Sequence, residues 1–293
     1  MVSFPNFYLV GAPRCGTTSM YTYLKQHPEI YLSVLKEPHF FSSDLTAPPQ
    51  AVVDQPLYLS LFEQVADERA VGEGSVWYLE SREAPWRIHE AVPEARILIL
   101  LRQPVDMAFS LHGLYCRTGN EELPDFDDAL AAQADRASGR RIPSETYFPE
   151  GLQYESVIRY SDRVERYLEI FGREQVRVLI FEEMVADPAR VYREALEFLR
   201  VDPDFVAEFD RDRAKVVIRQ RVLQQLRTTA PEIRAKMKGG GQRHTVARSR
   251  AVRPETRRRI EENMAEDVER LAQLLDRDLA RWWPSATRVL SRS

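Results

Sequence analysis

The hydrophobic pattern of the chain changes abruptly near its start. Apolar and aromatic residues at Phe7–Val10 stop at Gly11, and an apolar spacing typical of a helix runs over Thr17–Leu24. This pattern predicts a strand, a tight loop over residues 11–16 and a helix. A loop of this kind can turn its backbone N–H groups inward, and the start of the helix adds further donors and the positive end of its dipole. We therefore interpret the segment as a site for a phosphate or a similar anion.

The same strand and helix patterns alternate along the rest of the chain. Arg96–Leu101 is continuously apolar after its first residue, which predicts a parallel strand covered on both faces. Shorter apolar runs predict strands at 30–32, near the glycines at 72 and 74, and at 176–181. Helical spacing predicts helices at 57–65, 85–91, 104–115, 154–171, 188–199 and 254–279. The alternation favours an α/β fold, with a single domain over residues 1–293 and a mostly parallel central sheet flanked by helices.

Composition restricts the possible partners. The chain is 44% hydrophobic and 29% charged with a net charge of −4, so nucleic acid and acidic membranes are not attracted in general, and any anion site must be local. Its two cysteines do not form a disulfide framework, and we interpret Cys15 as a small filler of the loop rather than a nucleophile. We find no secretory signal pattern and no apolar run as long as a membrane span, which predicts a soluble cytoplasmic protein.

The predicted loop differs from that of a nucleoside triphosphatase. Gly11 and Gly16 have the P-loop spacing, but Thr17 occupies the position of the lysine that contacts the β- and γ-phosphates. The cation lies instead inside the loop as Arg14, whose fork of N–H groups suits an oxyanion. Hydroxyl donors follow at Thr17, Thr18 and Ser19. We therefore expect an anionic nucleotide that is used without a metal.

A second cation follows the predicted central strand. Arg102 comes directly after Arg96–Leu101, and ligands of open α/β sheets bind at the carboxyl ends of the strands. We therefore expect Arg102 and the loop over residues 11–16 to face the same crevice.

Three strings, in their order and spacing, resemble one known family. GAPRCGTTSMYTYL, KEPHFF and LLRQPVDMAFSLHGLY are similar to the sulfotransferases that use 3′-phosphoadenosine 5′-phosphosulfate (PAPS), especially the bacterial branch akin to the heparan sulfate type. Residues 151–184 and 254–283 also look like that branch, so the resemblance spans nearly the whole chain. It implies an O-sulfotransferase that moves the sulfuryl group of PAPS in line to a hydroxyl and releases adenosine 3′,5′-bisphosphate without a metal. The implied acceptor is small or medium in size: a natural product, a lipid or a glycan.

The resemblance also implies which residues hold the donor. Arg102 and Ser110 match the pair that binds the 3′-phosphate. Lys238 and Gly239, with Arg243 assisting, resemble a late loop that closes over that phosphate. The residues that match the loop for the 5′-phosphosulfate are Arg14, Cys15, Gly16, Thr17, Thr18 and Ser19.

Catalytic roles follow from the same resemblance. Glu37 matches the glutamate proposed as general base in the heparan-type enzymes, and burial beside the two phenylalanines of KEPHFF is expected to raise its pKa. His39 is the alternative base, and His112 is a third candidate at a looser spacing. Lys36 would either reach the bridging oxygen of the donor or pair with Glu37, while Arg14 would neutralise the leaving phosphate.

One departure from the family pattern leaves other functions open. Relatives of this type carry a lysine in a G-E-K-[ST] string, whereas this chain has Gly74 at that position. Charge compensation must then come from elsewhere, or the acceptor differs. The alternatives are a P-loop kinase-like phosphotransferase, against which Thr17 and Arg102 argue, and a nucleotide-binding module without catalysis. The sequence predicts neither the acceptor nor the oligomeric state.

Overall fold

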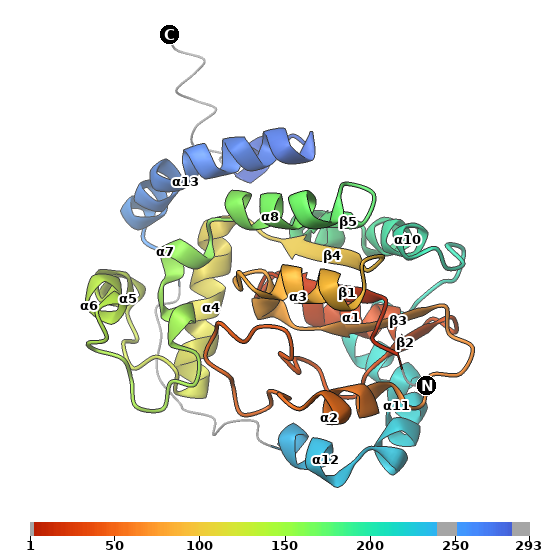
Figure 1. Ribbon diagram of the computed structural model, residues 1–293. Helices are drawn as coiled ribbons and strands as arrows, with labels where there is room; N and C mark the ends of the chain where they lie inside the picture. The colour runs from red at the N-terminus through yellow and green to blue at the C-terminus, as the bar shows by residue number, and fades with distance from the viewer. Residues whose placement is uncertain (1–2, 239–250, 283–293) are drawn as a thin grey trace. The chain divides into compact units, whose positions relative to one another are not determined.

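The chain forms two compact units that are interleaved in sequence. The computed structural model describes residues 3–238 and 251–282 (Figure 1). The first unit comprises residues 1–102 and 167–240, and the second comprises residues 103–166 and 241–293. Each unit is therefore built from two separate stretches of chain, and the single domain expected from the sequence stays a prediction.

The first unit holds the sheet. Every pair of neighbouring strands is parallel, in the order β2-β3-β1-β4-β5. All residues of β1 are buried, and so are all residues of β4 after its first, because both faces of these strands are covered. The predicted α/β class with a parallel central sheet is confirmed. Within the described residues the strands are β1 (Phe7–Gly11), β2 (Ile30–Leu32), β3 (Ala70–Gly74), β4 (Arg96–Leu101) and β5 (Val176–Ile180).

Helices of the first unit pack around this sheet. Helix α10 contacts β4 and β5, and α1 contacts α10 and α11. The helix predicted at 57–65 is wrong in its bounds, because α2 ends at Leu59 and a 3-10 turn, η1 (Ser60–Phe62), follows. The described helices are α1 (Thr17–Leu24), α2 (Gln55–Leu59), η2 (Val76–Tyr78), α3 (Ala84–Ala91), α9 (Phe181–Ala186), α10 (Pro188–Leu199), α11 (Arg211–Thr228) and α12 (Pro231–Lys238).

Helices α11 and α12 were not predicted. The apolar residues of α11 do not form one buried stripe, since Val216, Val217 and Leu223 are 70%, 55% and 47% exposed. The start of α11 is fixed instead by Asp210, whose side chain accepts hydrogen bonds from the N–H groups of the second and third residues of the helix.

The described part of the second unit is helical. The helix predicted at 154–171 is interrupted, because the Asp267 carboxylate accepts hydrogen bonds from Tyr160 N at 2.9 Å and from Ser161 N and Oγ at 3.3 and 2.6 Å. This cap starts α8, which runs on into the first unit. Helix α13 ends at Leu275, earlier than predicted, because Asp276 takes a left-handed conformation. The elements are α4 (Pro104–Thr118), α5 (Phe126–Ala131), α6 (Gln133–Ala137), η3 (Pro149–Leu152), α7 (Tyr154–Val157), α8 (Ser161–Phe171), α13 (Pro254–Leu275) and η4 (Ala280–Trp282).

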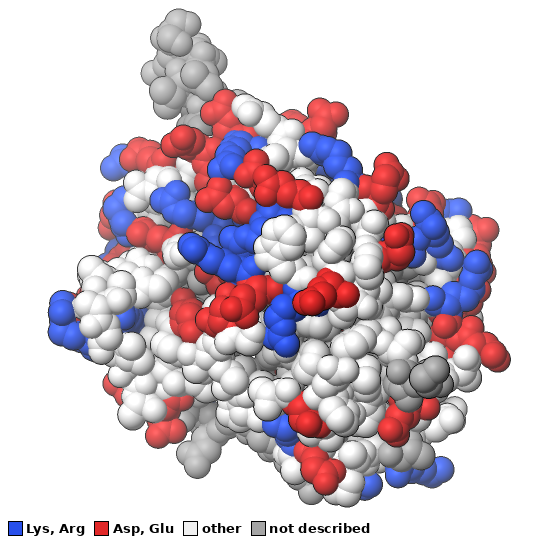
Figure 2. Space-filling view, viewed as in Figure 1, with Lys and Arg blue, Asp and Glu red and all other residues white. Residues whose placement is uncertain are grey.

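The surface carries both signs of charge in close mixture. Figure 2 shows acidic and basic side chains interspersed on the face drawn, in keeping with the net charge of −4. No helix of the described residues has an apolar stretch long enough to cross a bilayer.

Candidate functional site

The loop between β1 and α1 lies tightly against α9. Gly16 has a left-handed φ of 83°, and a Cβ atom there would lie 2.3 Å from Met184 Cε and 2.8 Å from Phe181 Cδ2. The N–H groups of Ser19 and Met20 donate to the Gly16 carbonyl at 2.9 and 3.0 Å, which begins α1. Only glycine combines this φ with so close an approach.

The start of α1 is electrostatically suited to an anion. Its first turn, described in full, contains no acidic residue, so the helix dipole favours negative charge there. Thr17 is buried, and so is Cys15, whose thiol donates to the Pro13 carbonyl at 3.4 Å, in keeping with a filler role. The predicted binding side chains that are exposed or half-buried are Arg14, Thr18 and Ser19.

Arg102 reaches the same loop. Its Nη1 donates to the Arg14 carbonyl at 3.4 Å, and its guanidinium carbon lies 4.7 Å from the centroid of the Phe181 ring. The expected proximity of Arg102 to the loop after β1 is therefore confirmed. The role of the two arginines in binding a nucleotide stays a prediction.

The other predicted 3′-phosphate residues lie apart in the chain. Ser110 is half-buried on α4 in the second unit, and Lys238 is the last residue of α12 in the first. Gly239 and Arg243 lie outside the described residues. That these residues bind the 3′-phosphate stays a prediction.

Glu37 lies between two basic side chains. Its Oε1 is 2.5 Å from Lys36 Nζ, and its Oε2 is 3.6 Å from Nε2 of the buried His39. Burial alone would raise the pKa of Glu37, but the Lys36 ammonium and the His39 ring outweigh it and hold the pKa below its usual value. The expectation of a raised pKa is therefore wrong, because the sequence did not reveal how closely Lys36 pairs with the carboxylate. Glu37 is ionised at neutral pH.

The loop that carries Glu37 has an unusual backbone. Glu37 and His39 both have positive φ values, 63° and 53°, which non-glycine residues adopt rarely. Three backbone N–H groups of this loop bind the last residue of β3 and the segment that follows it, and these bonds hold the loop in place. They join Glu37 N to Gly74 O at 2.9 Å, His39 N to Ser75 Oγ at 3.1 Å and Phe41 N to Tyr78 Oη at 3.1 Å.

Glu73 orients the side chains that bind the Glu37 loop, a role that the sequence analysis did not predict. It is fully buried in β3 and accepts hydrogen bonds from Tyr78 Oη at 2.7 Å, Ser75 Oγ at 2.8 Å and Tyr58 Oη at 3.2 Å. Because Ser75 and Tyr78 donate to Glu73, their lone pairs face the N–H groups of the Glu37 loop. Burial raises the pKa of Glu73 to about 7, although the three hydroxyl donors oppose that shift. A single acidic residue within a buried strand was the available signal.

The residues around Gly74 leave little room for a side chain at this position. A Cβ atom at this position would lie 3.1 Å from Cδ2 of Tyr21 on α1, which is tighter than ordinary contact. Tyr21 in turn is fixed, because its hydroxyl donates to the Ser33 carbonyl at 2.6 Å. A lysine here would therefore have to displace the tyrosine ring.

His112 lies in the interior of the second unit. It is fully buried on α4, and its Nε2 lies 2.9 Å from the Leu123 carbonyl oxygen. Its ring packs against Phe126 and Tyr154, with centroids 5.3 and 5.8 Å away. These contacts favour a packing role over that of a base.

Comparison with curated proteins gives partial matches. Carbohydrate sulfotransferase 15 of Rattus norvegicus is 26% identical over 254 residues, which cover 68% of this chain and 44% of that protein. The bifunctional heparan sulfate N-deacetylase/N-sulfotransferase 3 of Homo sapiens is 28% identical over 215 residues, which cover 69% and 23%. The chain thus spans less than half the length of these relatives.

A solved structure and a family profile match nearly the whole chain. The crystal structure of a sulfotransferase from Alicyclobacillus acidocaldarius superposes with a TM-score of 0.76 at 35% identity, over 96% of this chain and 99% of that one. Residues 4–282 match the family described as the sulfotransferase domain. The resemblance found in the sequence is confirmed, and the chain belongs to the sulfotransferase family.

Proposed function

We propose that this protein is an O-sulfotransferase that takes the sulfuryl group from PAPS and releases adenosine 3′,5′-bisphosphate. Family membership supports sulfuryl transfer. The observation that carries the choice of donor is the loop before α1. Thr17 occupies the position of the P-loop lysine, Arg14 supplies a cation from within the loop, and Arg102 donates a hydrogen bond to the loop backbone.

Each end of the donor has its own proposed residues. Arg14 and the N–H groups at the start of α1, with Thr17, Thr18 and Ser19, bind the 5′-phosphosulfate. Arg102 and Ser110, assisted by Lys238 and Gly239, bind the 3′-phosphate. Arginine suits both ends, because its planar fork binds oxyanions in a bidentate manner.

Glu37 acts as the general base. PAPS, when bound, supplies the sulfuryl group; Glu37 accepts the proton of the acceptor hydroxyl, while Arg14 and Lys36 stabilise the negative charge on the leaving phosphate oxygen. In the unbound protein the pair with Lys36 keeps the pKa of Glu37 low and makes it a weak base. Donor oxygens that draw Lys36 away would raise the pKa of Glu37 and so activate it.

Lys36 supplies the cation that Gly74 lacks. The Glu37 N–H donates to the Gly74 carbonyl at 2.9 Å, so Lys36 enters the site from the loop beside that position. Lys36 would thus provide the positive charge that is missing at residue 74, and the reaction need not differ from sulfuryl transfer. The acceptor is a hydroxyl of a natural product, a lipid or a glycan, and the names of the curated relatives make carbohydrates part of any test panel.

The first test is protection against thermal unfolding. Adenosine 3′,5′-bisphosphate should raise the melting temperature, and Arg14→Gln should remove most of that effect, whereas the exposed Arg219→Gln should not. Protection by ATP with magnesium, and not by the bisphosphate, would overturn the proposal and favour a kinase-like enzyme. Bisphosphate protection without turnover on phenols, sugars and lipid alcohols would favour a binding module.

A further inference from the structure

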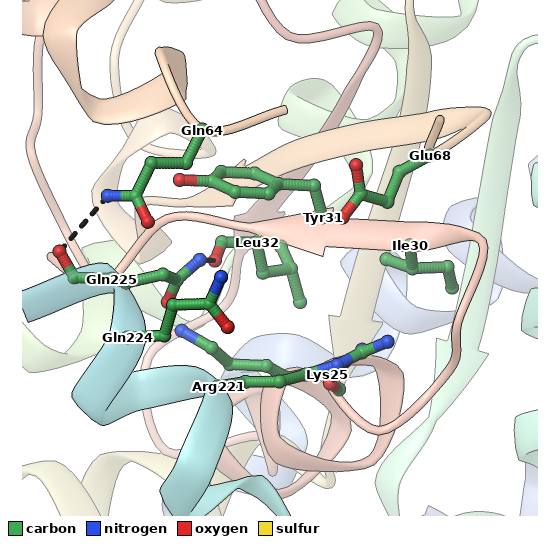
Figure 3. Close-up of a pocket in the computed structure, with 9 residues that line it drawn as sticks. All are labelled: Lys25, Ile30, Tyr31, Leu32, Gln64, Glu68, Arg221, Gln224 and Gln225. Carbon is green, nitrogen blue, oxygen red and sulfur yellow. Dashed lines mark hydrogen bonds between the residues drawn. The ribbon is translucent and has the colours of Figure 1, made fainter. Parts of the chain in front are cut away.

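A pocket lined by two basic side chains lies in the first unit, beside the edge strand β2. It has a volume of about 120 Å³ and is bounded by the end of α1, by β2 and by α11 (Figure 3). None of its lining residues belongs to the proposed donor or acceptor site. The polar and charged side chains used below are Lys25, Gln64, Glu68, Arg221, Gln224 and Gln225.

Two of these side chains are cations that donate hydrogen bonds to backbone carbonyls. Lys25 is only 4% exposed, and its Nζ donates to the Ser33 carbonyl at 3.2 Å. Arg221 Nη1 donates to the carbonyls of Lys25 and His27 at 2.9 and 2.7 Å. Within residues 3–238 and 251–282, neither cation forms an ion pair with an acidic side chain. Burial of a charge without a counter-ion is unfavourable, so an anion entering this pocket would be stabilised.

The pocket lining favours an anion over a cation. Figure 3 shows Lys25 and Arg221 side by side on one side of β2, with Gln224 near them. Glu68 lies on the opposite side of the strand, and its carboxylate accepts a hydrogen bond from Ala66 N at 2.8 Å. Its negative charge is therefore directed to its own loop rather than to the two cations.

We propose that this pocket binds a small inorganic oxyanion of the size of sulfate or phosphate. The oxygens of the anion would accept hydrogen bonds from Lys25 Nζ, from the Arg221 guanidinium and from the Gln224 carboxamide. The carboxamide of Gln225 is engaged elsewhere, because its Nε2 donates to the Leu32 carbonyl at 2.9 Å and fixes α11 to β2. The site is separate from the loop before α1 and does not depend on the reaction proposed above.

Anion binding here is coupled to the proton on Lys25. Burial and the nearby Arg221 lower the pKa of Lys25 to about 7, and a bound anion would raise it. The other groups facing the pocket are the Arg221 guanidinium, the Glu68 carboxylate and Tyr31, whose pKa is raised to about 12. Since the anion prefers protonated Lys25, its affinity should fall by up to about tenfold per pH unit above pH 7, and binding should take up to about one proton.

The experiment compares sulfate with chloride at equal ionic strength on the full chain. At about five times its Kd, sulfate should raise the melting temperature by about 2 to 4 °C over chloride. In an Arg14→Gln background, where sulfate no longer binds the loop before α1, Lys25→Met should abolish this difference while the protein still folds, because an apolar side chain of similar length replaces a buried charge. Glu68→Gln, which removes the one acidic side chain of the lining, should give the same shift at about threefold lower sulfate.

A variant of the loop distinguishes this pocket from the proposed donor site. Arg14→Gln should retain the sulfate effect, and Lys25→Met should retain protection by adenosine 3′,5′-bisphosphate, so the two proposals can fail independently. A sulfate effect that survives Lys25→Met in the Arg14→Gln background, or that disappears in Arg14→Gln alone, would overturn the inference. If Lys25→Met does not fold, crystals of the unaltered protein soaked in selenate test the site instead. Anomalous selenium density between Lys25 and Arg221 supports the site, and its absence there rejects it.

Discussion

The ion pair of Glu37 with Lys36 has two opposing effects on its proposed role as a base. Its carboxylate is paired with Lys36 at 2.5 Å, which favours the ionised form needed to accept a proton but lowers its basicity. Its position on a loop with positive φ is fixed from outside by backbone hydrogen bonds. The proposed activation of Glu37 therefore depends on whether the Lys36 ammonium leaves Glu37 to bind oxygens of the donor.

Replacement of Glu37 tests the base directly. Glu37→Gln should lower turnover by about 10²- to 10⁴-fold, because the amide cannot accept the proton. Protection by adenosine 3′,5′-bisphosphate should change little, and the exposed Glu63→Gln serves as the matched control. Unchanged turnover in Glu37→Gln would transfer the role to His39.

Glu73 should make stability depend on pH. Its pKa is raised from 4.5 to about 7, so the folded protein keeps a proton that the unfolded chain has lost between these values. The contribution of Glu73 to the free energy of unfolding therefore falls as the pH rises from about 4.5 to about 7 and is constant above.

Urea unfolding of the unaltered protein and of Glu73→Gln at several pH values measures this contribution. The variant should be less stable at pH 5, because its amide places two N–H donors, instead of the single O–H of the protonated carboxyl, against hydroxyls that already donate toward residue 73. The difference between the two proteins should shrink toward pH 7. A difference that is independent of pH would contradict the raised pKa.

At the scale of elements, the turn into α1 depends on a glycine in two separate ways. Gly16→Ala would introduce strain at φ 83° and a clash with Met184 and Phe181. Gly172 has a similar φ of 75°, but a Cβ atom there would have no neighbour within 4 Å, so Gly172→Ala measures the strain alone. We expect about 1 kcal/mol of destabilisation at Gly172 and more than about 2 kcal/mol at Gly16, measured by urea unfolding. Equal losses would show that the contact with α9 relaxes freely.

The break between α7 and α8 depends on one carboxylate. Asp267→Ala removes the acceptor for Tyr160 N, Ser161 N and Ser161 Oγ, and leaves these buried donors unsatisfied. The expected loss in the free energy of unfolding is about 1–3 kcal/mol. The neighbouring exposed Glu266→Ala should lose less than about 0.5 kcal/mol.

An element could be predicted from the sequence when its bounds are set by its own residues, and not when they are set by contacts with distant parts of the chain. The strand Arg96–Leu101 and the helix Thr17–Leu24 were predicted at their observed bounds. The strand is a continuous apolar run and the helix has regular apolar spacing, so each signal lies within the element itself. The interruption of the helix at 154–171 could not be found, because its cause, Asp267, lies more than a hundred residues away in the sequence. The same holds for the site: the loop and Arg102 follow from local pattern, whereas the Glu73 contacts join segments that only the fold brings together.

At the scale of the whole molecule, each compact unit is completed by a distant part of the chain. In the second unit α13 packs against α4, which lies about 150 residues earlier in the chain, and buries Met264 completely. Met264→Asp should therefore destabilise this unit by about 3 kcal/mol or more, because a charge replaces a buried apolar side chain. The adjacent exposed Asn263→Asp is the control, and tryptophan fluorescence in urea is the measurement. Two equally stable variants would mean that the contact with α4 contributes little.

The packing of Gly74 beneath Tyr21 has an evolutionary consequence. A Cβ atom at residue 74 would press on the Tyr21 ring at 3.1 Å, so we expect the effects of substitutions at residues 74 and 21 not to be additive. Gly74→Lys alone would meet the ring of Tyr21, whereas a smaller residue at 21 would first open the way. A gain of this cation would therefore be helped by a change in α1, far along the chain from β3.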